Sequence, residues 1–387
     1  MQRRDFIKLL GLSGVSLAIP RWALAAPLSA PRSRRYLILV ELKGGNDGLN
    51  TVVPYTDSNY YRLRPNLAVA RDKVVQLDHK LGLHPSLSDL MPLWRDKQLA
   101  IVQGVGYANP NLSHFRSIEI WDTGSDSNEY LDAGWLSQLL NVAPKNKNRM
   151  ADGIVIGQGT GPLLGNERAL SMQDPQRFLR QAGRLTATVS QTDNPALQHI
   201  LDTQNRVHDA AQQLATRLHG SRIKPSDFPR SPIGRQLAVT AQIINAQIPT
   251  AVIKVGLGGF DTHTNQAGTQ QRMLGQLGKA LAALRKSLQQ NNKWDEVMVM
   301  TYSEFGRRVA ENGNRGTDHG TAAPQFFMGG GVKGGLYGKT PSLGQLDDGN
   351  LRHHVDFRRL YSTVAHWWGI KASANPFGRY PGIDLLG

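Results

Sequence analysis

The chain has 387 residues, a formal net charge of +15, 40% hydrophobic content and no cysteine. The absence of cysteine excludes thiolate metal sites, iron–sulfur clusters, c-type haem attachment and disulfide bonds, so any bound metal must use oxygen and nitrogen ligands. The basic residues are scattered and form no basic stripe, which argues against a nucleic-acid partner. Such a charge instead attracts anionic substrates or anionic lipid headgroups.

The N-terminus has the features of a twin-arginine export signal. A pair of arginines, Arg3 and Arg4, precedes an apolar run over 9–19 and an Ala-Leu-Ala cleavage site. The run is about half as long as a membrane-spanning helix requires, and no other segment is long and apolar enough to form a stable membrane span. We therefore predict a twin-arginine signal peptide over 1–25 and a periplasmic or secreted single α/β domain over 26–387.

Six short apolar segments that each end in a glycine or polar loop predict buried strands. Helical segments lie between several of them, and this alternation predicts an α/β fold with a doubly wound, mostly parallel sheet flanked by helices. Residues 171–247 differ, because they are helical in pattern, rich in Gln and Ala and interrupted by prolines; they predict a helical insertion that serves as a lid or an interaction face. The predicted strands are 36–42, 99–102, 153–156, 251–255, 297–300 and 325–328, and the predicted helices are 83–94, 272–289 and 357–368.

Four polar clusters follow predicted strands or open predicted helices, which is where open α/β sheets bind ligands. Their mixed carboxylate and imidazole groups suit one or two divalent ions, of Zn, Mn, Mg or Ca, that could polarise an ester oxygen and activate a hydroxyl. The candidate metal ligands are Asp47, Asp261, His263, Glu304, Asp318 and His319, and the candidate catalytic residues are Ser113, His114 and Arg116.

The predicted start of a helix at Ser113 suggests chemistry for its hydroxyl group. Free N–H groups and the helix dipole favour negative charge there, so Ser113 is a candidate nucleophile or anion anchor, and Arg116, one turn further on, could fork onto an anion. Structural interpretations remain open beside these. Asp47 also fits a turn former, Ser113 an N-cap and Glu304 the partner of a nearby arginine.

Seven segments, taken with the leader, resemble the exported bacterial family known as domain of unknown function 1501. That family is similar to the alkaline phosphatase and sulfatase superfamily, so the resemblance implies an alkaline phosphatase/sulfatase-like fold. It also implies that Asp47 is the metal ligand after the first strand, that Ser113 is the nucleophile, and that Asp261, His263 and His319 hold one metal. The matching segments are 40–55, 83–94, 111–124, 258–266, 301–308, 316–331 and 356–368.

One position departs from the superfamily pattern. Where the superfamily has Asp-His after a strand, this chain has Glu304-Phe305, so the imidazole ligand of the second metal is missing. Three outcomes stay open: Asp318 helps to fill the gap, or one metal binds, or the site is no longer a competent two-metal hydrolase.

Three classes of function are compatible with these patterns. The leading hypothesis is an exported metal-dependent hydrolase that acts on an anionic ester substrate, a phosphate or a sulfate ester. The alternative is a non-catalytic periplasmic protein on the same fold that binds a glycan, a lipid headgroup or an exported protein partner through 171–247. A redox protein with a bulky cofactor is the third, although the chain lacks cysteines and the His-x-His patterns of copper sites.

Overall fold

The structure is a computed structural model that describes residues 35–144, 149–184, 191–218 and 223–387. All of these residues belong to one compact unit, Arg34–Gly387. The predicted leader over 1–25 lies outside the described residues. Among the helices that the structure describes, none combines the length and the hydropathy needed to cross a membrane.

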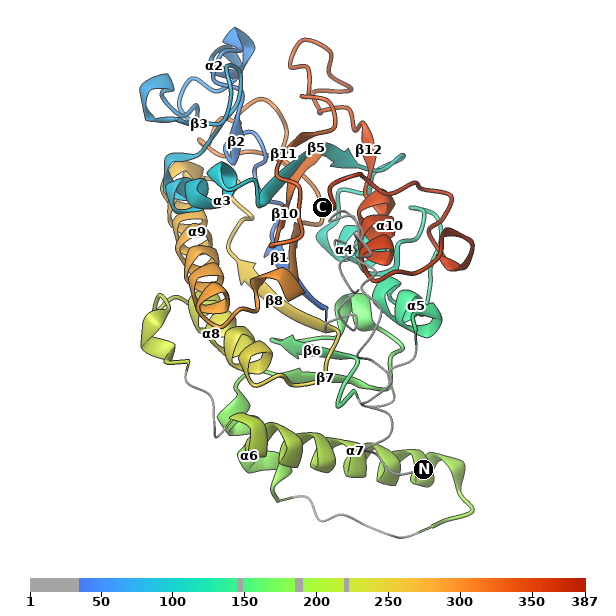
Figure 1. Cartoon of the computed structure of the whole chain (residues 1–387). Coiled ribbons are helices and arrows are strands. Elements are labelled where there is room, and N and C mark those ends of the chain that lie inside the picture. The colour runs from blue at the N-terminus through green and yellow to red at the C-terminus, as the bar shows by residue number, and fades with distance from the viewer. Residues whose placement is uncertain (1–34, 145–148, 185–190, 219–222) are drawn as a thin grey trace, which may run out of the picture. The chain divides into compact units, whose positions relative to one another are not determined.

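A mixed, mostly parallel sheet lies at the centre of this unit and confirms the predicted fold class (Figure 1). Its middle strand, β1 (Tyr36–Lys43), pairs in parallel with β8 (Val252–Gly258) on one side and with β9 (Val297–Tyr302) on the other. β10 (Ala323–Met328) runs antiparallel to β9, because the chain re-enters the sheet at the same edge at which β9 ends. The strand order is β11-β5-β10-β9-β1-β8-β6-β7, with β12 beside β5, for β5 (Leu99–Gly106), β6 (Gly153–Ile156), β7 (Ala169–Met172), β11 (Gly335–Tyr337) and β12 (Val355–Asp356).

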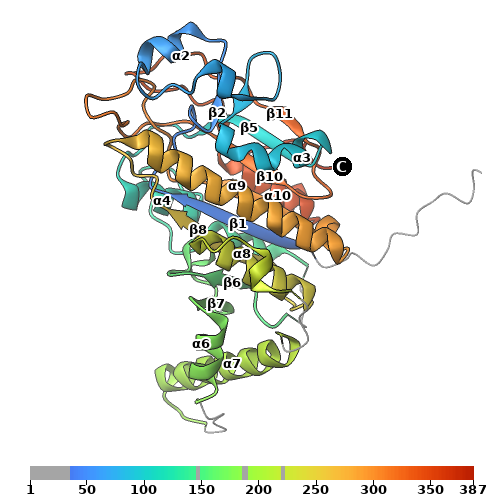
Figure 2. The same cartoon turned by 90° about the vertical axis from the view of Figure 1, so that its left-hand side faces the viewer.

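Both faces of the sheet are covered by helices, because the central strands are apolar on both faces. In β1, Ile38 and Val40 point into one hydrophobic core, whereas Leu37 and Leu39 point into the other. The first face carries η3 (Pro85–Leu90), α3 (Met91–Arg95), α8 (Pro232–Asn245) and α9 (Gln266–Gln290), and the second carries α4 (His114–Thr123), α5 (Trp135–Val142) and α10 (Arg358–Trp367). Figure 2 shows α8 and α9 in front of β1, with α9 running nearly along it.

Two of the predicted helices are observed as single elements, since α9 and α10 cover 272–289 and 357–368 almost completely. The predicted helix over 83–94 is divided instead into η3 and α3. Pro92 at the start of α3 has no N–H to continue the preceding turn, so the chain begins a new helix there.

The predicted insertion over 171–247 contributes to two parts of the fold. Its last helix, α8, packs on β8 and α9 and so belongs to the helix layer over the sheet. The other helices, α6 (Pro175–Ala182) and α7 (Pro195–Leu218), pack on each other beyond the edge strand β7, at the bottom of Figure 1.

The residues between β1 and η3 form a small subdomain, whose hydrophobic cluster around Tyr60 and Val53 also includes Val309, Ala322, Leu343 and Leu351. Its short strands make a three-stranded antiparallel sheet in the order β2-β4-β3. Its elements are β2 (Val52–Val53), α2 (Ser58–Leu63), η2 (Arg71–Lys73), β3 (Val75–Gln76) and β4 (Gly82–Leu83), and the remaining 3-10 turns of the chain are η4 (Gly161–Leu163), η5 (Pro225–Asp227), η6 (Trp294–Glu296) and η7 (Ala372–Ala374).

Candidate metal centre

The turn that follows β1 allows the loops after β1, β8 and β9 to meet. Gly44 has a φ of 111°, and a Cβ added to it would lie 2.3 Å from the backbone nitrogen of Asp261. Gly45 has a φ of 71°, and its added Cβ would lie 2.4 Å from the ring of Phe305. Only glycine tolerates both the backbone conformation and the close approach, so the Gly-Gly pair brings these strand ends together.

Three predicted site residues converge at this edge of the sheet. His114 begins α4, Asp261 follows β8, and His319 lies in the loop that leads to β10. One ligand atom from each of the three lies within 4.8 Å of the others. Their convergence at the carboxyl ends of parallel strands is the arrangement expected of a ligand site in an α/β sheet.

The imidazole of His114 is held in one tautomer by Glu304. Its Nδ1 lies 2.8 Å from Oε1 of Glu304, which also accepts the backbone N–H of Gly44 at 2.8 Å. A carboxylate accepts hydrogen bonds, so Nδ1 carries a proton, and the neutral form of the ring then has its lone pair on Nε2. This buried Nε2 has no hydrogen-bond partner among the described residues and lies 3.5 Å from Oδ2 of Asp261.

A backbone carbonyl sets the tautomer of His319 in the same way. Its Nδ1 lies 2.7 Å from the carbonyl oxygen of Leu112, which can only accept, so the lone pair is on Nε2. Burial lowers the pKa of the His319 ring, and the positive charge of Arg307 lowers it further. The ring is therefore neutral near pH 7 and presents Nε2 to the cluster.

His263 adds a fourth candidate ligand atom. Its Nε2 lies 3.0 Å from Nε2 of His319 and 3.1 Å from Oδ1 of Asp261, while its Nδ1 lies 3.2 Å from Oδ1 of Asp318. If Nδ1 donates to Asp318, the lone pairs of two imidazole nitrogens face each other. They do not stay so close unless a proton or a metal ion lies between them.

Asp261 is oriented by a fully buried arginine. Oδ1 of Asp261 accepts from Arg307 at 2.8 Å, and the same guanidinium donates to the carbonyl oxygens of Gly44, Gly45, Phe260 and Thr317. Partial burial raises the pKa of Asp261, but Arg307 and the nearby imidazoles lower it more, so the net pKa is below its usual value. Arg307 thus links the turn after β1, the loop after β8 and the loop that leads to β10. It also keeps Asp261 ionised.

Two predicted metal ligands, Glu304 and Asp318, each lie within hydrogen-bond distance of the Nδ1 atom of an imidazole, on the side of the ring away from Nε2. Glu304, which is 4% exposed, is engaged by His114, by Gly44 and by the hydroxyl of Ser303. Asp318 bonds to Asn312 and to His263, and these hydrogen bonds lower its pKa despite some burial. Both carboxylates are placed to orient an imidazole.

Asp47 has its carboxylate engaged away from the imidazoles. Its Oδ1 accepts from the backbone N–H groups of Leu49 and Asn50, and its Oδ2 lies 2.6 Å from the fully buried guanidinium of Arg64 and also accepts from Gln266. No contact joins Asp47 to His114, Asp261 or His319 among the described residues. Its surroundings are those of a buried ion pair.

The two remaining candidates lie on α4 and have different environments. Ser113 is exposed, adopts the extended N-cap conformation, and makes no side-chain cap hydrogen bond. Arg116 is turned into the protein, where it donates to the carbonyl oxygens of Asp126 and Ser127 and stacks over the ring of Tyr130 at 3.8 Å. Arg116 therefore holds the loop after α4 and does not point its guanidinium toward the three-residue cluster.

Phe305 follows Glu304 in the chain and packs beside two imidazoles of the site. Its ring centroid lies 4.8 Å from that of His114 and 4.5 Å from that of His319, and the residue is 3% exposed. The ring fills the space beside the imidazoles with hydrocarbon. It supports their orientation by packing and offers no ligand atom.

Sequence reasoning did not find the functions of Arg307, Leu112 and Phe305 in this site. Arg307 was visible only as an arginine close to Glu304, and the structure pairs it with Asp261. The carbonyl of Leu112 leaves no signal in side-chain chemistry. Phe305 was noted as a missing ligand, but its packing against two imidazoles depends on the tertiary structure.

These features define a mixed α/β protein with a candidate metal centre at the carboxyl ends of its parallel strands. The chain belongs to the family described as "Protein of unknown function (DUF1501)", which matches residues 34–380. The predicted family membership is thereby confirmed. No curated protein matches the sequence.

Solved structures similar to this chain include members of the alkaline phosphatase and sulfatase superfamily. One is the PsFucS1 sulfatase from Pseudoalteromonas sp., with 11% identity, a TM-score of 0.40, and coverage of 92% of this chain and 72% of that chain. Another is the C-terminal periplasmic domain of EcEptC from Escherichia coli in complex with Zn, with 10% identity, a TM-score of 0.39, and coverage of 76% and 72%. A third is a protein in the alkaline phosphatase superfamily from Vibrio parahaemolyticus, with 9% identity, a TM-score of 0.38, and coverage of 87% and 67%.

Proposed function

We propose that the chain binds one divalent transition-metal ion, with Zn²⁺ the best match to the donor set. The ligands would be Nε2 of His114, Nε2 of His319, Nε2 of His263 and a carboxylate oxygen of Asp261. One observation carries this proposal: two imidazoles donate Nδ1–H to fixed acceptors, while their Nε2 atoms converge with a carboxylate within 4.8 Å. Metal-binding histidines are oriented by acceptors at the other ring nitrogen in this way.

One ion, and not two, agrees best with the neighbouring side chains. Phe305 contributes a hydrocarbon ring beside the cluster, and both oxygens of Asp47 already accept hydrogen bonds. Glu304 and Asp318 would then support the ligands His114 and His263 from behind. In this proposal His114 changes from a catalytic candidate to a metal ligand.

We propose further that the metal centre serves the hydrolysis of a phosphate or sulfate ester, with Ser113 as nucleophile. A bound divalent ion would polarise an ester oxygen and favour ionisation of a nearby hydroxyl. Ser113 directly precedes the proposed ligand His114, is exposed, and lies at the N-terminus of a 10-residue helix, where free N–H groups favour an anionic group. Residues 1–25 carry four basic side chains and one acidic one, a net +3, so the chain without them keeps a formal net charge of +12 of the full +15, which also favours approach of an anionic substrate.

Export by the twin-arginine route completes the proposal. This pathway carries folded cargo, so the metal would be acquired before the protein leaves the cytoplasm. The support for this step is the sequence pattern over 1–25.

A non-catalytic metal-stabilised binding protein is the second candidate. The observation that favours it is the environment of Ser113, whose hydroxyl has no hydrogen bond to a general base among the described residues. Arg116, the predicted anion contact, is committed to backbone carbonyls. Both features fit a centre whose metal orders the loops at the strand ends without performing a reaction.

The test begins with the metal content of the purified protein. Elemental analysis of wild type is expected to give one equivalent of metal, and the double variant His114→Ala/His319→Ala is expected to lose it. Wild type is then assayed against p-nitrophenyl phosphate, p-nitrophenyl sulfate and a panel of biological phosphate and sulfate esters. The variant Ser113→Ala should keep the metal and lose the hydrolysis.

The outcomes separate the two candidates. Metal binding without cleavage of any ester would favour the non-catalytic protein. The absence of stoichiometric metal, together with no gain in thermal stability on addition of Zn²⁺, would reject both. Hydrolysis that persists at the wild-type rate in Ser113→Ala would exclude Ser113 as the nucleophile.

A further inference from the structure

We propose that a second site, between the small subdomain and the start of α9, binds an acidic saccharide of one or two sugar units. The site is a cavity of ≈ 710 Å³. The side chains that carry the proposal are Lys73, His84, Ser86, Gln270 and Gln271, from η2, the η3 segment and α9. None of them belongs to the metal centre, so this proposal is independent of the proposed hydrolysis.

His84 supplies a neutral hydrogen-bond donor to this cavity. Its Nδ1 accepts the backbone N–H of Ser86 at 3.1 Å, so the proton of the neutral ring is on Nε2. Burial lowers the pKa of His84 to about 4, against a smaller opposite effect of Asp47. The ring therefore stays neutral at physiological pH, and its Nε2–H has no protein acceptor among the described residues.

Gln270 supplies a buried acceptor that lacks a protein partner. Only 1% of the residue is exposed, yet it lines the cavity. Its Nε2 donates to Oδ1 of Asn46 at 3.0 Å and faces the carbonyl oxygen of Asp47 at 3.3 Å, which fixes the orientation of the amide. Oε1 then has no hydrogen-bond partner among the described residues. A buried acceptor left in this state is costly, and because Oε1 itself has almost no accessible surface, a ligand could bond to it only after the side chains that cover it shift.

Lys73 provides a positive charge that is not neutralised within the protein. It is exposed at the rim, no ion pair to it is found in the described part of the chain, and no carboxylate is among the cavity's lining residues. His84 adds no charge, because its ring is neutral. A ligand with one negative group would therefore be attracted to this end of the cavity.

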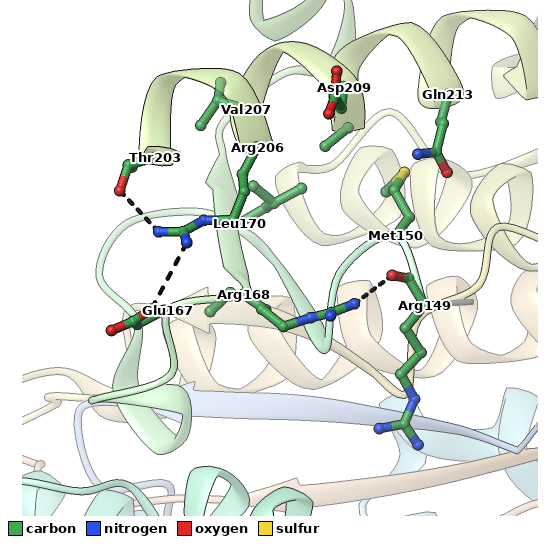
Figure 3. Close-up of a pocket in the computed structure, with 12 residues that line it drawn as sticks. Arg149, Met150, Glu167, Arg168, Leu170, Thr203, Arg206, Val207, Asp209 and Gln213 are labelled. Atoms are coloured by element: carbon green, nitrogen blue, oxygen red, sulfur yellow. Dashed lines mark hydrogen bonds and ion pairs between the residues drawn. The ribbon is translucent and has the colours of Figure 1, made fainter. Parts of the chain in front are cut away.

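A second cavity, of ≈ 390 Å³ between β7 and α7, provides a contrast (Figure 3). Several of its charged side chains already have partners within the protein. Arg206 lies 3.8 Å from Glu167 and donates to Thr203, and Arg168 donates to the carbonyl oxygen of Arg149 (Figure 3). Its arginines are thus partly satisfied by neighbours, whereas the polar groups around Lys73 and Gln270 still have unused bonding capacity.

The chemistry of the first cavity matches a hydroxylated carboxylate. A neutral donor on His84, the Ser86 hydroxyl and the exposed amide of Gln271 can pair with sugar hydroxyls, which are both donors and acceptors. Lys73 can pair with the carboxylate of an acidic sugar. The residues that line the cavity include no Phe, Tyr or Trp, so recognition would depend on hydrogen bonds and charge. The volume is in the range of known small-molecule sites, about 300–1,000 Å³.

The test is calorimetric titration of the wild-type protein with three probes. Glucuronate carries hydroxyls and a carboxylate, glucose carries hydroxyls only, and succinate carries carboxylates only. Glucuronate is expected to bind with a Kd of about 1 mM or tighter and at least about tenfold more tightly than either of the others. Lys73→Ala should weaken glucuronate binding about tenfold and leave glucose binding unchanged. Lys80→Ala, which removes an exposed lysine that does not line the cavity, should change neither.

Two further variants keep the test decisive. Gln271→Ala, at an exposed position, should weaken the binding of both glucuronate and glucose, whereas His114→Ala should leave both unchanged because the metal centre is not involved. The proposal is overturned if the wild-type protein, shown by circular dichroism to be folded, binds none of the three probes at concentrations up to about 10 mM. It is equally overturned if succinate binds as well as glucuronate, or if Lys73→Ala and Lys80→Ala behave alike.

Discussion

Oε1 of Glu304 accepts a hydrogen bond from Nδ1 of His114, at 2.8 Å, while Nε2 of the same ring faces Asp261. The carboxylate therefore fixes which nitrogen of His114 is free to bind a metal. It also makes that nitrogen a stronger ligand, because a negative charge behind the ring increases the basicity of Nε2.

Replacement of this carboxylate is expected to weaken metal binding without removing a ligand. Glu304→Gln keeps the size of the side chain but removes its charge, so the affinity for Zn²⁺ should fall by about 10- to 100-fold. Competition titration with a chromophoric chelator measures this change. Glu167→Gln is the matched control, because it makes the same substitution at an exposed glutamate that pairs with Arg206 and not with a residue of the metal centre. It should bind Zn²⁺ like wild type. Equal affinities for Glu304→Gln and wild type would show that Glu304 does not orient the ligand.

Asp47 should be essential for stability and dispensable for the metal. Asp47→Asn leaves the fully buried Arg64 without its carboxylate partner, so we expect the free energy of unfolding to fall by about 3 kcal/mol or more. Urea unfolding measures the loss, and elemental analysis of the folded variant should still find one equivalent of metal. Loss of the metal from a folded Asp47→Asn protein would contradict this view and restore Asp47 as a ligand.

Gly44 should not tolerate a side chain. Gly44→Ala would place a Cβ 2.3 Å from the backbone nitrogen of Asp261 at a φ of 111°, so the free energy of unfolding should fall by at least about 2 kcal/mol. Metal affinity should fall as well, because the turn carries the N–H that bonds to Glu304. Gly258→Ala is the control, since no heavy atom lies within 4 Å of its added Cβ, and its stability should stay within about 0.5 kcal/mol of wild type.

The buried ring of His84 should make stability depend on pH. Its pKa is about 4 in the folded protein against 6.5 for the ordinary ring, so the unfolded chain binds a proton between these values that the folded protein does not. The stability present above pH 6.5 should therefore be lost as the pH falls toward 4, by about 3 kcal/mol from this residue. Urea unfolding of wild type and of His84→Asn at both pH values isolates this contribution. An identical loss in the two proteins would assign the pH dependence to other groups.

The sheet and most of its helices could be predicted from the sequence because their signal is local. Tyr36–Leu42 is apolar at every position but Glu41, which is typical of a central strand covered on both faces, and the structure places it there. Short elements such as β11 and β12 carry too few residues for a pattern. The antiparallel direction of β10 could not be predicted either, since it depends on the edge from which the loop enters the sheet.

The sequence indicated where three of the predicted site residues would gather, but it did not separate them from Asp47 and Arg116, which are engaged elsewhere. Strand ends and helix starts indicated where His114, Asp261 and His319 would gather, because parallel strands bring their carboxyl ends to one edge. Which carboxylate faces a metal and which faces an imidazole is decided by tertiary contacts. Glu304 and Asp47 illustrate this, since one is bonded to His114 and the other to Arg64.

The long sequence separations inside the cluster impose an order on its formation during synthesis. The amide of Gly44 and the carboxylate that it bonds are 260 residues apart, and His319 is made later still. A chain emerging from the ribosome therefore lacks the complete ligand set until most of its length has been translated. Any metal that the finished centre holds must be captured after that point, and a truncated chain ending before residue 319 could not retain it at this site.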